Sequence, residues 1–277
     1  MFSVILALTL ATLLVLDLAW TDRGVLPAPT EIFTGIIYGR ERIEPTEEGG
    51  GMLHWARIDL SAPGIGLYVT PLDRNAVARS WQYRLRRVGT VAERHHLALA
   101  VNAMLFVTGS SWPELLPGAY ARGVETAIAD HVVSHVWPDT YLLWFDDALT
   151  PTLERYKPPP SAALARARWG IGGQGIGLWD GEVGPFSVGK PDSRTAVAID
   201  RARRLLFLAV GEYISPRLIL QKLASLGARE GMLLDGGHSS AMAIGTHARG
   251  LGAGAVYGGW WPVATQFGIR ARPLWPA

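Results

Sequence analysis

One segment in the C-terminal third constrains the fold of this chain most strongly. Ser215 suits the N-cap of a helix, Pro216 suits its first position, and Gly227 suits the residue just after its end. An apolar run at positions 232–234 follows, and it predicts a buried strand that leads into Asp235. The sequence therefore predicts a helix, a short turn, a strand and a tight Asp-Gly-Gly loop, in this order.

The loop that begins at Asp235 contains the residues that we expect to form a site. Gly236 and Gly237 have no Cβ atom, so the backbone there can come close to a ligand. Short polar or titratable side chains would project near the same end of the strand: Asp235, His238, Ser239 and Ser240. Backbone amides in such a loop are suited to holding an anionic group.

The composition places this segment in a strand-rich domain. The chain has 277 residues, among them 32 glycines and 18 prolines, and long helical patterns without glycine are scarce. Hydrophobic residues make up 49% and charged residues 18%, which excludes a disordered chain. We expect an α+β fold: a single domain with a mixed, mostly antiparallel sheet and a few helices.

Charge and cysteine content exclude several classes of site. The chain has no cysteine, so disulfides, thiolate catalysis and cysteine-based zinc sites are excluded. The formal net charge is only +2. The dense basic segments are Arg84–Arg87 and Arg201–Arg204, and we interpret both as solvated faces of turns or helices. Neither has the interleaved aromatic residues of a nucleic-acid footprint, so we expect no nucleic-acid partner.

Apolar runs predict further strands along the chain. Two alternating runs, 195–199 and 205–210, flank a basic turn and predict a β-hairpin. A helix interrupted near Gly89 is expected between residues 76 and 96, and a glycine-dense loop is expected at 170–177. Further strands are predicted at Leu53–Leu60, Gly66–Thr70, Leu97–Val101 and Tyr141–Phe145.

The N-terminal end is apolar from Val4 to Trp20, apart from two threonines and one aspartate. This length is near the lower limit for a membrane-spanning helix and slightly long for the core of a signal peptide. We expect an export signal at 1–22 that can stay as a membrane anchor, a linker at 23–52 and the domain at 53–272. A buried N-terminal core helix is the alternative. The expected location is extracytoplasmic, either periplasmic or secreted.

Five segments resemble the phosphodiester glycosidase family, which has lysosomal and bacterial exopolysaccharide-associated members. The family pattern Leu-Asp-Gly-Gly-Gly-Ser-Ser matches at Asp235, except that His238 replaces the third glycine. After Asn102, where the family has Asn-Gly-Gly-Tyr-Phe, both glycines are missing. The segments are IDLSAPGIGLYVTP (58–71), ALAVNAMLF (98–106), DSRTAVAID (192–200), LLDGGHSS (233–240) and WPVATQFGI (261–269).

The resemblance implies an exported hydrolase that cleaves the sugar from a sugar-1-phosphodiester in an envelope or exopolysaccharide glycan. A carboxylate can stabilise the oxocarbenium-like transition state of such a reaction, and we choose Asp235 for this role. Arg194 would bind the phosphate through its guanidinium fork, unless it forms an ion pair with Asp192 or Asp200. Asn102 would either hydrogen-bond a sugar hydroxyl or simply end its strand.

The remaining candidate groups surround Asp235 or follow a neighbouring strand. Glu212 comes just after a buried strand and is the candidate second carboxylate. His238 would supply a proton or bond a phosphate oxygen, because an unperturbed imidazole has a pKa near 6.5. The alternative is that His238 is a surface-loop histidine without a functional role. Four residues would shape the phosphate or sugar loop: Gly236, Gly237, Ser239 and Ser240.

Two other functions fit parts of the sequence. Gly-His-Ser-Ser-Ala, with Ser239 in the middle, is close to the nucleophile elbow of a serine esterase. We discount the esterase because no Asp or Glu follows Ser240 and because the elbow needs a helix directly after its serine. A non-catalytic protein for glycan binding or exopolysaccharide assembly, on the same fold, is the main alternative.

The sequence contains no strong metal motif. His131 and His135 are four residues apart, but their segment resembles a strand, and His-Glu-x-x-His is absent. A hard cation such as Ca²⁺ or Mg²⁺, bound by Asp235 and carbonyl oxygens, would leave little trace in a sequence. The expected partners are a carbohydrate phosphodiester and, through residues 4–20, the membrane. The oligomeric state is not predicted.

Overall fold

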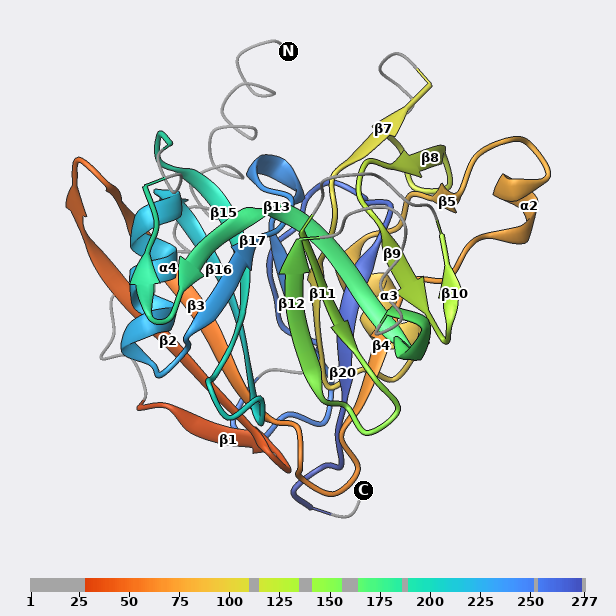
Figure 1. The fold of residues 1–277 in the computed structure, drawn as a ribbon. Coiled ribbons are helices and arrows are strands. Elements are labelled where there is room, and N and C mark those ends of the chain that lie inside the picture. Colours follow the sequence, from red (N-terminus) through yellow and green to blue (C-terminus); the bar gives the residue numbers. More distant parts are fainter. Residues whose placement is uncertain are drawn as a thin grey trace, which may run out of the picture.

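The protein is built mainly from antiparallel sheets, with a few short helices around them (Figure 1). The structure is a computed structural model that describes residues 28–109, 115–134, 141–155, 164–185, 189–251 and 254–275. Every pair of adjacent strands in this part of the chain is antiparallel. The expected α+β fold with a mostly antiparallel sheet is confirmed.

The largest sheet is 12-stranded, with the main order β1-β2-β3-β16-β15-β17-β13-β11-β12, while β9 and β14 pair with β13 and β10 pairs with β9. Strand β13 joins two halves of this sheet, because its first half pairs with β9 and β11 and its second half with β17 and β14. The strands are β1 (Thr30–Phe33), β2 (Ile36–Thr46), β3 (Gly49–Asp59), β9 (Ala127–Ala129), β10 (Val132–Val133), β11 (Tyr141–Phe145), β12 (Pro151–Arg155), β13 (Trp169–Trp179), β14 (Glu182–Val183), β15 (Asp192–Ile199), β16 (Leu205–Ile214) and β17 (Glu230–Leu233).

Two smaller sheets complete the strand structure. One has five strands in the order β19-β18-β6-β20-β4, and the other has three in the order β5-β8-β7. Their strands are β4 (Gly66–Val69), β5 (Tyr83–Arg84), β6 (Leu99–Asn102), β7 (Phe106–Thr108), β8 (Tyr120–Gly123), β18 (Ala241–Ile244), β19 (Val256–Gly258) and β20 (Gln266–Arg270). The helical segments are α2 (Arg74–Val77), α3 (Val88–Arg94), α4 (Pro216–Ser225) and the 3₁₀ turns η1 (Leu164–Arg166) and η2 (Gly237–Ser239).

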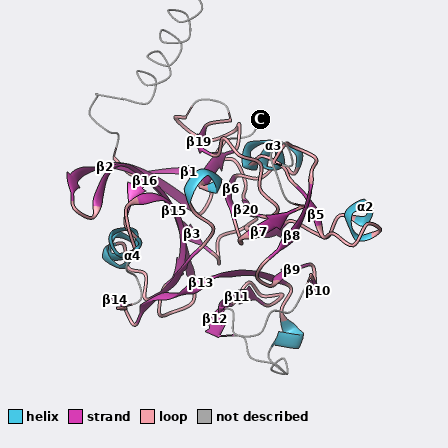
Figure 2. Ribbon diagram, turned by 90° about the horizontal axis from the view of Figure 1, so that it is seen from above, coloured by secondary structure: helices cyan, strands magenta, loops and turns pink. Residues whose placement is uncertain are grey.

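The main core lies between the 12-stranded and the 5-stranded sheet. Phe145 of β11 and Phe267 of β20 stack there with ring centroids 5.9 Å apart, and both side chains are fully buried. A second apolar cluster lies on the other face of the large sheet, where Ile219, Leu220 and Leu223 of α4 pack against it. Figure 2 shows α4 on this outer side. Burying both faces holds the central strands, and therefore the loops at their ends, in place.

The segment from Ser215 to Asp235 has the predicted local structure. The Ser215 hydroxyl accepts a hydrogen bond from the Leu218 amide and caps α4, which begins at Pro216. Gly227 has φ +106 just after the helix end, a conformation that favours glycine. The predicted hairpin is also present, as β15 and β16. Local signals in the sequence thus specify the segment from β15 to Asp235.

Three predictions about the elements are wrong. Most of the predicted linker at 23–52 forms β1, β2 and the beginning of β3, because apolar residues such as Ile32 and Ile36 alternate there and are buried. The helix expected between 76 and 96 is divided into α2, β5 and α3. The expected loop at 170–177 lies within strand β13, because its glycines admit neighbouring strands at close range.

The predicted export signal or anchor falls on residues 1–27, which lie outside the described part of the chain. Within the described part, no helix combines the length and the apolar character that crossing a membrane requires.

Candidate active site

Asp235 lies in the turn directly after β17, where β15 of the large sheet and the end of β6 of the five-stranded sheet hold the backbone. The Leu234 amide donates to the Thr195 carbonyl (2.9 Å), and the Asp235 amide donates to the Ala103 carbonyl (2.9 Å). The Asp235 carbonyl accepts a hydrogen bond from Nδ2 of Asn102 (2.6 Å). The residue is only 7% exposed. This carboxyl group is therefore placed by long-range contacts rather than by its own turn.

Asn102 positions the turn that carries Asp235. Its side chain is fully buried at the end of β6, and its Oδ1 accepts hydrogen bonds from the Thr195 hydroxyl (2.7 Å) and the Ala241 amide (3.0 Å). With Nδ2 bonded to the Asp235 carbonyl, this one amide joins β6, β15, β18 and the Asp235 turn. The direct contact with a sugar predicted for Asn102 does not fit this burial, so we assign it a positioning role instead.

The two glycines after Asp235 are required by close packing and by backbone conformation. A Cβ atom on Gly236 would lie 3.1 Å from the Ser193 carbonyl oxygen and 3.4 Å from Nη1 of Arg194. Gly237 has φ +61, in the left-handed region that favours glycine. In this structure the Arg194 side chain lies close to Gly236, and the close approach of a ligand to these glycines stays a prediction.

Arg194 lies against this glycine loop with part of its guanidinium group free. Its Nη2 donates to the Lys190 carbonyl (2.8 Å), and its buried Nε has no hydrogen-bond partner among the described residues. Within that part of the chain no ion pair joins Arg194 to Asp192 or Asp200. Asp200 instead accepts hydrogen bonds from the backbone of the β15–β16 turn. No acid among the described residues therefore pairs with this guanidinium group, whose Nη1 lies beside Gly236.

Burial changes the acid strength of Asp235. It raises the pKa of this carboxyl from 3.8 to about 6, while hydrogen bonds from the Ser239 side chain and the Gly236 amide act in the opposite direction. The two donors stabilise the charged form and therefore support ionisation at neutral pH.

Glu125 is the second carboxyl group of this site, and the sequence analysis did not identify it. It is 5% exposed, and burial raises its pKa from 4.5 to about 7. Backbone amides of Leu105 and of Glu125 itself lower this pKa, whereas the charge of Asp235 raises it. Its Oε2 is buried and has no hydrogen-bond partner in the described structure. Two buried carboxyl groups, one of which raises the pKa of the other through its charge, are typical of an acid–base site.

The segment after Asn102 connects the two carboxyl groups. Ala103 accepts the Asp235 amide through its carbonyl group, and the Leu105 amide donates to the Glu125 carboxylate. Met104, between them, is buried against Gly123. Both contacts use backbone atoms of the segment. They therefore form even though this chain lacks the two glycines that follow Asn in the family pattern.

Glu212, the predicted second carboxylate, lies in a different environment. Its Oε2 accepts a long hydrogen bond from the Met52 amide (3.4 Å), and its buried Oε1 has no partner among the described residues. Burial raises its pKa, and the Met52 amide lowers it. The residue lines a small cavity of ≈ 20 Å³ together with His54 and Ser240. Asp235 does not act on it, so Glu125 replaces Glu212 as our second carboxyl group.

The polar residues of the loop divide into exposed and buried groups. His238 is exposed, and its ring meets the Trp261 ring edge-on with centroids 5.4 Å apart. Ser239 hydrogen-bonds the Asp235 carboxylate, whereas the Ser240 hydroxyl is buried behind the loop. Strand β18, not a helix, begins at Ala241. The nucleophile elbow that a serine esterase would need at Ser239 is therefore absent from this described segment.

Close packing of β13 makes the position of Glu125 sensitive to one glycine. A Cβ atom on Gly172 would lie 2.3 Å from Cβ of Glu125 and 3.0 Å from the Thr126 carbonyl oxygen. We expect Gly172→Ala to shift Glu125, to destabilise the protein by about 1–3 kcal/mol, and to lower kcat roughly tenfold or more. Thermal unfolding and turnover measure both effects. Gly66→Ala, whose Cβ would lie 3.7 Å from its nearest neighbour, is the matched control. Equal behaviour of the two variants would contradict the expectation.

In the described part of the chain, no group of three or more His, Asp or Glu side chains is placed to hold a metal ion. His135, one of the two histidines considered above, lies outside that part.

Comparisons with known proteins identify the family and the fold. The model of the phosphodiester glycosidase family matches residues 121–270, which include both carboxyl groups. One solved structure with a similar fold is the catalytic domain of zebrafish N-acetylglucosamine-1-phosphodiester alpha-N-acetylglucosaminidase, auto-inhibited by its pro-peptide. The TM-score is 0.61 and the sequence identity is 13%, and the match covers 90% of this chain and 87% of the zebrafish chain. A hypothetical protein from Synechocystis has a TM-score of 0.51 and 16% identity over 86% of this chain and 62% of its own. No curated protein matches the chain by sequence.

Proposed function

Because the chain belongs to the phosphodiester glycosidase family, we propose that it hydrolyses the bond between the anomeric carbon of a sugar and the oxygen of a phosphodiester. Water supplies the oxygen that ends on the sugar, and the phosphate leaves as a phosphomonoester. The observation that carries this proposal is the buried pair of Glu125 and Asp235, with Arg194 beside the same glycine loop.

The two carboxyl groups suit two different tasks. Asp235 has the lower pKa of the pair and accepts hydrogen bonds from Ser239 and Gly236, so it is the group that stays ionised near neutral pH. An ionised carboxylate stabilises the positive charge that develops on the sugar in the transition state. We therefore assign Asp235 to the sugar side of the reacting bond.

Glu125 suits the phosphate side of that bond. With a pKa of about 7 it stays largely protonated at slightly acid pH, so it does not repel the anionic diester. The leaving group is a phosphomonoester with a second pKa of about 6. A carboxylic acid of similar strength can donate a proton to it as the bond breaks. Arg194 would hold a phosphate oxygen through its free guanidinium positions.

The proposal predicts a bell-shaped pH dependence of kcat. Activity requires Asp235 ionised and Glu125 protonated, so it is expected to be greatest between about pH 6 and about pH 7. It falls below this window as Asp235 gains a proton and above it as Glu125 loses one. The measurement is the release of free sugar and phosphomonoester from a panel of sugar-1-phosphodiesters across this pH range. A rate that rises steadily to pH 9 would contradict these roles.

The same assay includes a chelator, because Ca²⁺ or Mg²⁺ bound at Asp235 remains a prediction. Loss of turnover with the chelator and its return with one of these cations would support a metal. Export, and a glycan of the cell envelope or exopolysaccharide as substrate, are further proposals that rest on the apolar run from Val4 to Trp20. A folded protein that binds glycans but releases no sugar from any diester would favour the non-catalytic alternative.

A further inference from the structure

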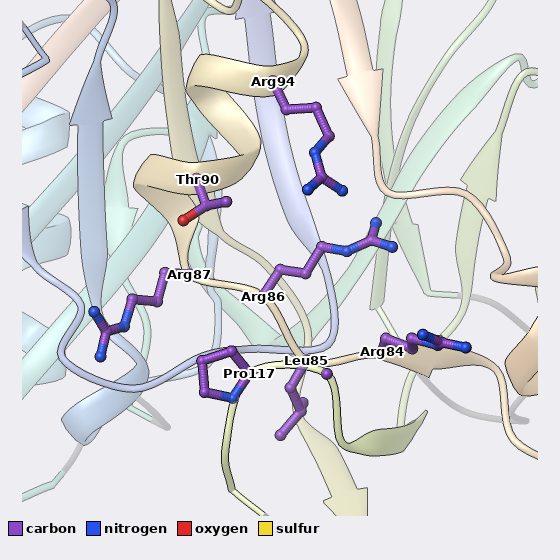
Figure 3. Close-up of a pocket in the computed structure, with 8 residues that line it drawn as sticks. Arg84, Leu85, Arg86, Arg87, Thr90, Arg94 and Pro117 are labelled. Atoms are coloured by element: carbon purple, nitrogen blue, oxygen red, sulfur yellow. The ribbon is translucent and has the colours of Figure 1, made fainter.

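A recess lined by arginines lies apart from the Glu125–Asp235 pair. It has a volume of ≈ 500 Å³ and lies between the segment Arg84–Arg87, helix α3 and the turn at Pro117. Figure 3 shows the guanidinium groups of Arg86 and Arg94 pointing toward one another from different elements. The lining includes Arg84, Arg86, Arg87, Thr90 and Arg94. The sequence analysis interpreted this basic run as a solvated face, but the structure places it around a concave surface.

The positive charges of the recess are poorly balanced by acids. The Asp73 carboxylate lies 3.3 Å from Nη2 of Arg86 and 3.7 Å from Nε of Arg84, and it also caps helix α2. Among the described residues, neither Arg87 nor Arg94 forms an ion pair. Within the described structure, one carboxylate thus pairs with two of the four guanidinium groups, and the other two have no acidic partner. Holding like charges together in this way costs free energy that a bound anion would offset.

The electric field of these arginines also acts on neighbouring side chains. Burial lowers the pKa of His95, and the charges of Arg270, Arg86 and Arg94 lower it further. Glu93, although it precedes Arg94 on the same helix, lines a different groove and does not face the recess. The carboxylate of Glu93 therefore does not offset the positive charge of the residues that line the recess.

Backbone hydrogen bonds fix the wall that carries these arginines. The Leu85 amide donates to the Ala119 carbonyl (2.8 Å), and the Gly118 amide donates to the Leu85 carbonyl (2.8 Å). Arg86 and Val263 exchange two backbone hydrogen bonds of 3.0 and 2.9 Å. Because the backbone is held on both sides, the arginines are presented from a rigid support, which lowers the entropy cost of binding.

The same wall leads to the candidate active site. Val263 follows Trp261 by two residues, and the Trp261 ring contacts His238 in the loop that begins at Asp235. At about 3.3 Å per residue, the reach of the chain places the recess within roughly 20 Å of that loop. This is a distance that a few sugar-phosphate units of one polymer can span.

We propose that the arginine recess binds a phosphate group of a polyanionic glycan whose sugar–phosphodiester bond is cleaved at Asp235. The inference rests on the proposed function and extends it, because it makes the substrate a polymer with repeated phosphates. Guanidinium groups from several elements can donate hydrogen bonds to several oxygens of one phosphate group. A concave recess can enclose a segment of a polymer, whereas the surface of a membrane is flat.

The first test measures anion binding without catalysis. Tripolyphosphate is titrated into the full chain, into Arg87→Ala/Arg94→Ala, and into the control Arg57→Ala/Arg229→Ala, which removes two exposed arginines elsewhere. We expect the affinity to fall about tenfold or more in the recess variant and to stay within about twofold in the control. Equal affinity in all three proteins would overturn the proposal. Thermal unfolding verifies that each variant is folded.

The second test compares substrates. For wild type and the recess variant, kcat/KM is measured on a poly(glycosyl phosphate) and on a single sugar-1-phosphodiester. We expect the ratio of the two values, polymer over single diester, to fall about tenfold in the variant. An unchanged ratio overturns the polymer assignment. Binding to phosphatidylglycerol vesicles is measured for the same two proteins. A recess variant that loses vesicle binding but still binds tripolyphosphate like wild type also overturns the polymer assignment. Arginine-dependent tripolyphosphate binding without turnover of either substrate contradicts the proposed function and supports only the anion site.

Discussion

Asp235→Asn is expected to lower kcat/KM for a sugar-1-phosphodiester by about 10³-fold or more, in a protein that remains folded. The amide has the shape of the carboxylate but no charge, so it cannot stabilise the cationic sugar of the transition state. The backbone contacts that hold this turn, from Asn102 and to Ala103, do not use the carboxylate. Turnover and thermal unfolding of the purified variant measure the two parts of this expectation.

Glu212→Gln is the matched control for Asp235→Asn. It also replaces a carboxyl group of raised pKa by an amide, and Glu212 is half-buried in a small cavity beside Ser240 of the same loop. Because Asp235 and Glu212 do not act on each other, we expect its kcat/KM to stay within about threefold of wild type. A loss in Glu212→Gln as large as that in Asp235→Asn would show that the second carboxyl group is Glu212 and not Glu125.

Glu125→Gln is expected to lower kcat about 10²-fold or more and to remove the fall of activity above pH 7. In wild type this fall reports the loss of the Glu125 proton, with its pKa of about 7. Glutamine has no proton to lose, so the remaining activity should no longer decrease on the alkaline side. The pH profile separates this role from a purely structural one, because a misplaced active site would lower the rate without changing the shape of the curve.

The same variant has an expected effect on stability. Burial raises the pKa of Glu125 from 4.5 to about 7 in the folded protein, so the folded state binds the proton more tightly than the unfolded chain. Its contribution to stability is therefore greatest at low pH and is lost as the pH rises through about 7. At pH 8 the charged, buried carboxylate destabilises the fold by roughly 3 kcal/mol as an upper bound. Glu125→Gln should thus raise Tm at pH 8, by roughly 5 °C, and change it little at pH 4. An equal shift at both pH values would contradict the pKa of Glu125.

The sequence allowed the segment from β15 to β17, which leads to Asp235, to be predicted, because its signals are local. A serine cap and a glycine at the two ends of α4 specify that helix. Alternating apolar residues specify the hairpin of β15 and β16. The predicted loop at 170–177 was wrong because glycine usually signals a loop, whereas in β13 Gly172 and Gly173 admit Glu125 and the β17 backbone at close range. Such packing depends on partners distant in sequence.

The second carboxyl group could not be chosen from the sequence for a similar reason. Glu125 stands alone between β8 and β9, and no nearby motif distinguishes it from any other glutamate. Its one local signal is that a charged residue closely precedes the apolar strand β9, whose three residues are all buried. The interaction that identifies it, with Asp235, joins residues 110 positions apart and exists only in the folded protein. Glu212 resembled a better candidate because it follows a buried apolar run. Its strand β16 ends at the same edge as β17, but its carboxylate bonds the Met52 amide and is not affected by Asp235.

The central claim is that water attacks the sugar and that the bond between the anomeric carbon and oxygen breaks. Hydrolysis of a sugar-1-phosphodiester in water enriched in ¹⁸O, followed by mass spectrometry of both products, tests this most directly. The account predicts that the label enters the free sugar and that the phosphomonoester contains none. Label in the phosphate would show cleavage between phosphorus and oxygen, which Asp235 and Glu125 in the roles assigned here would not perform, and it would contradict the account.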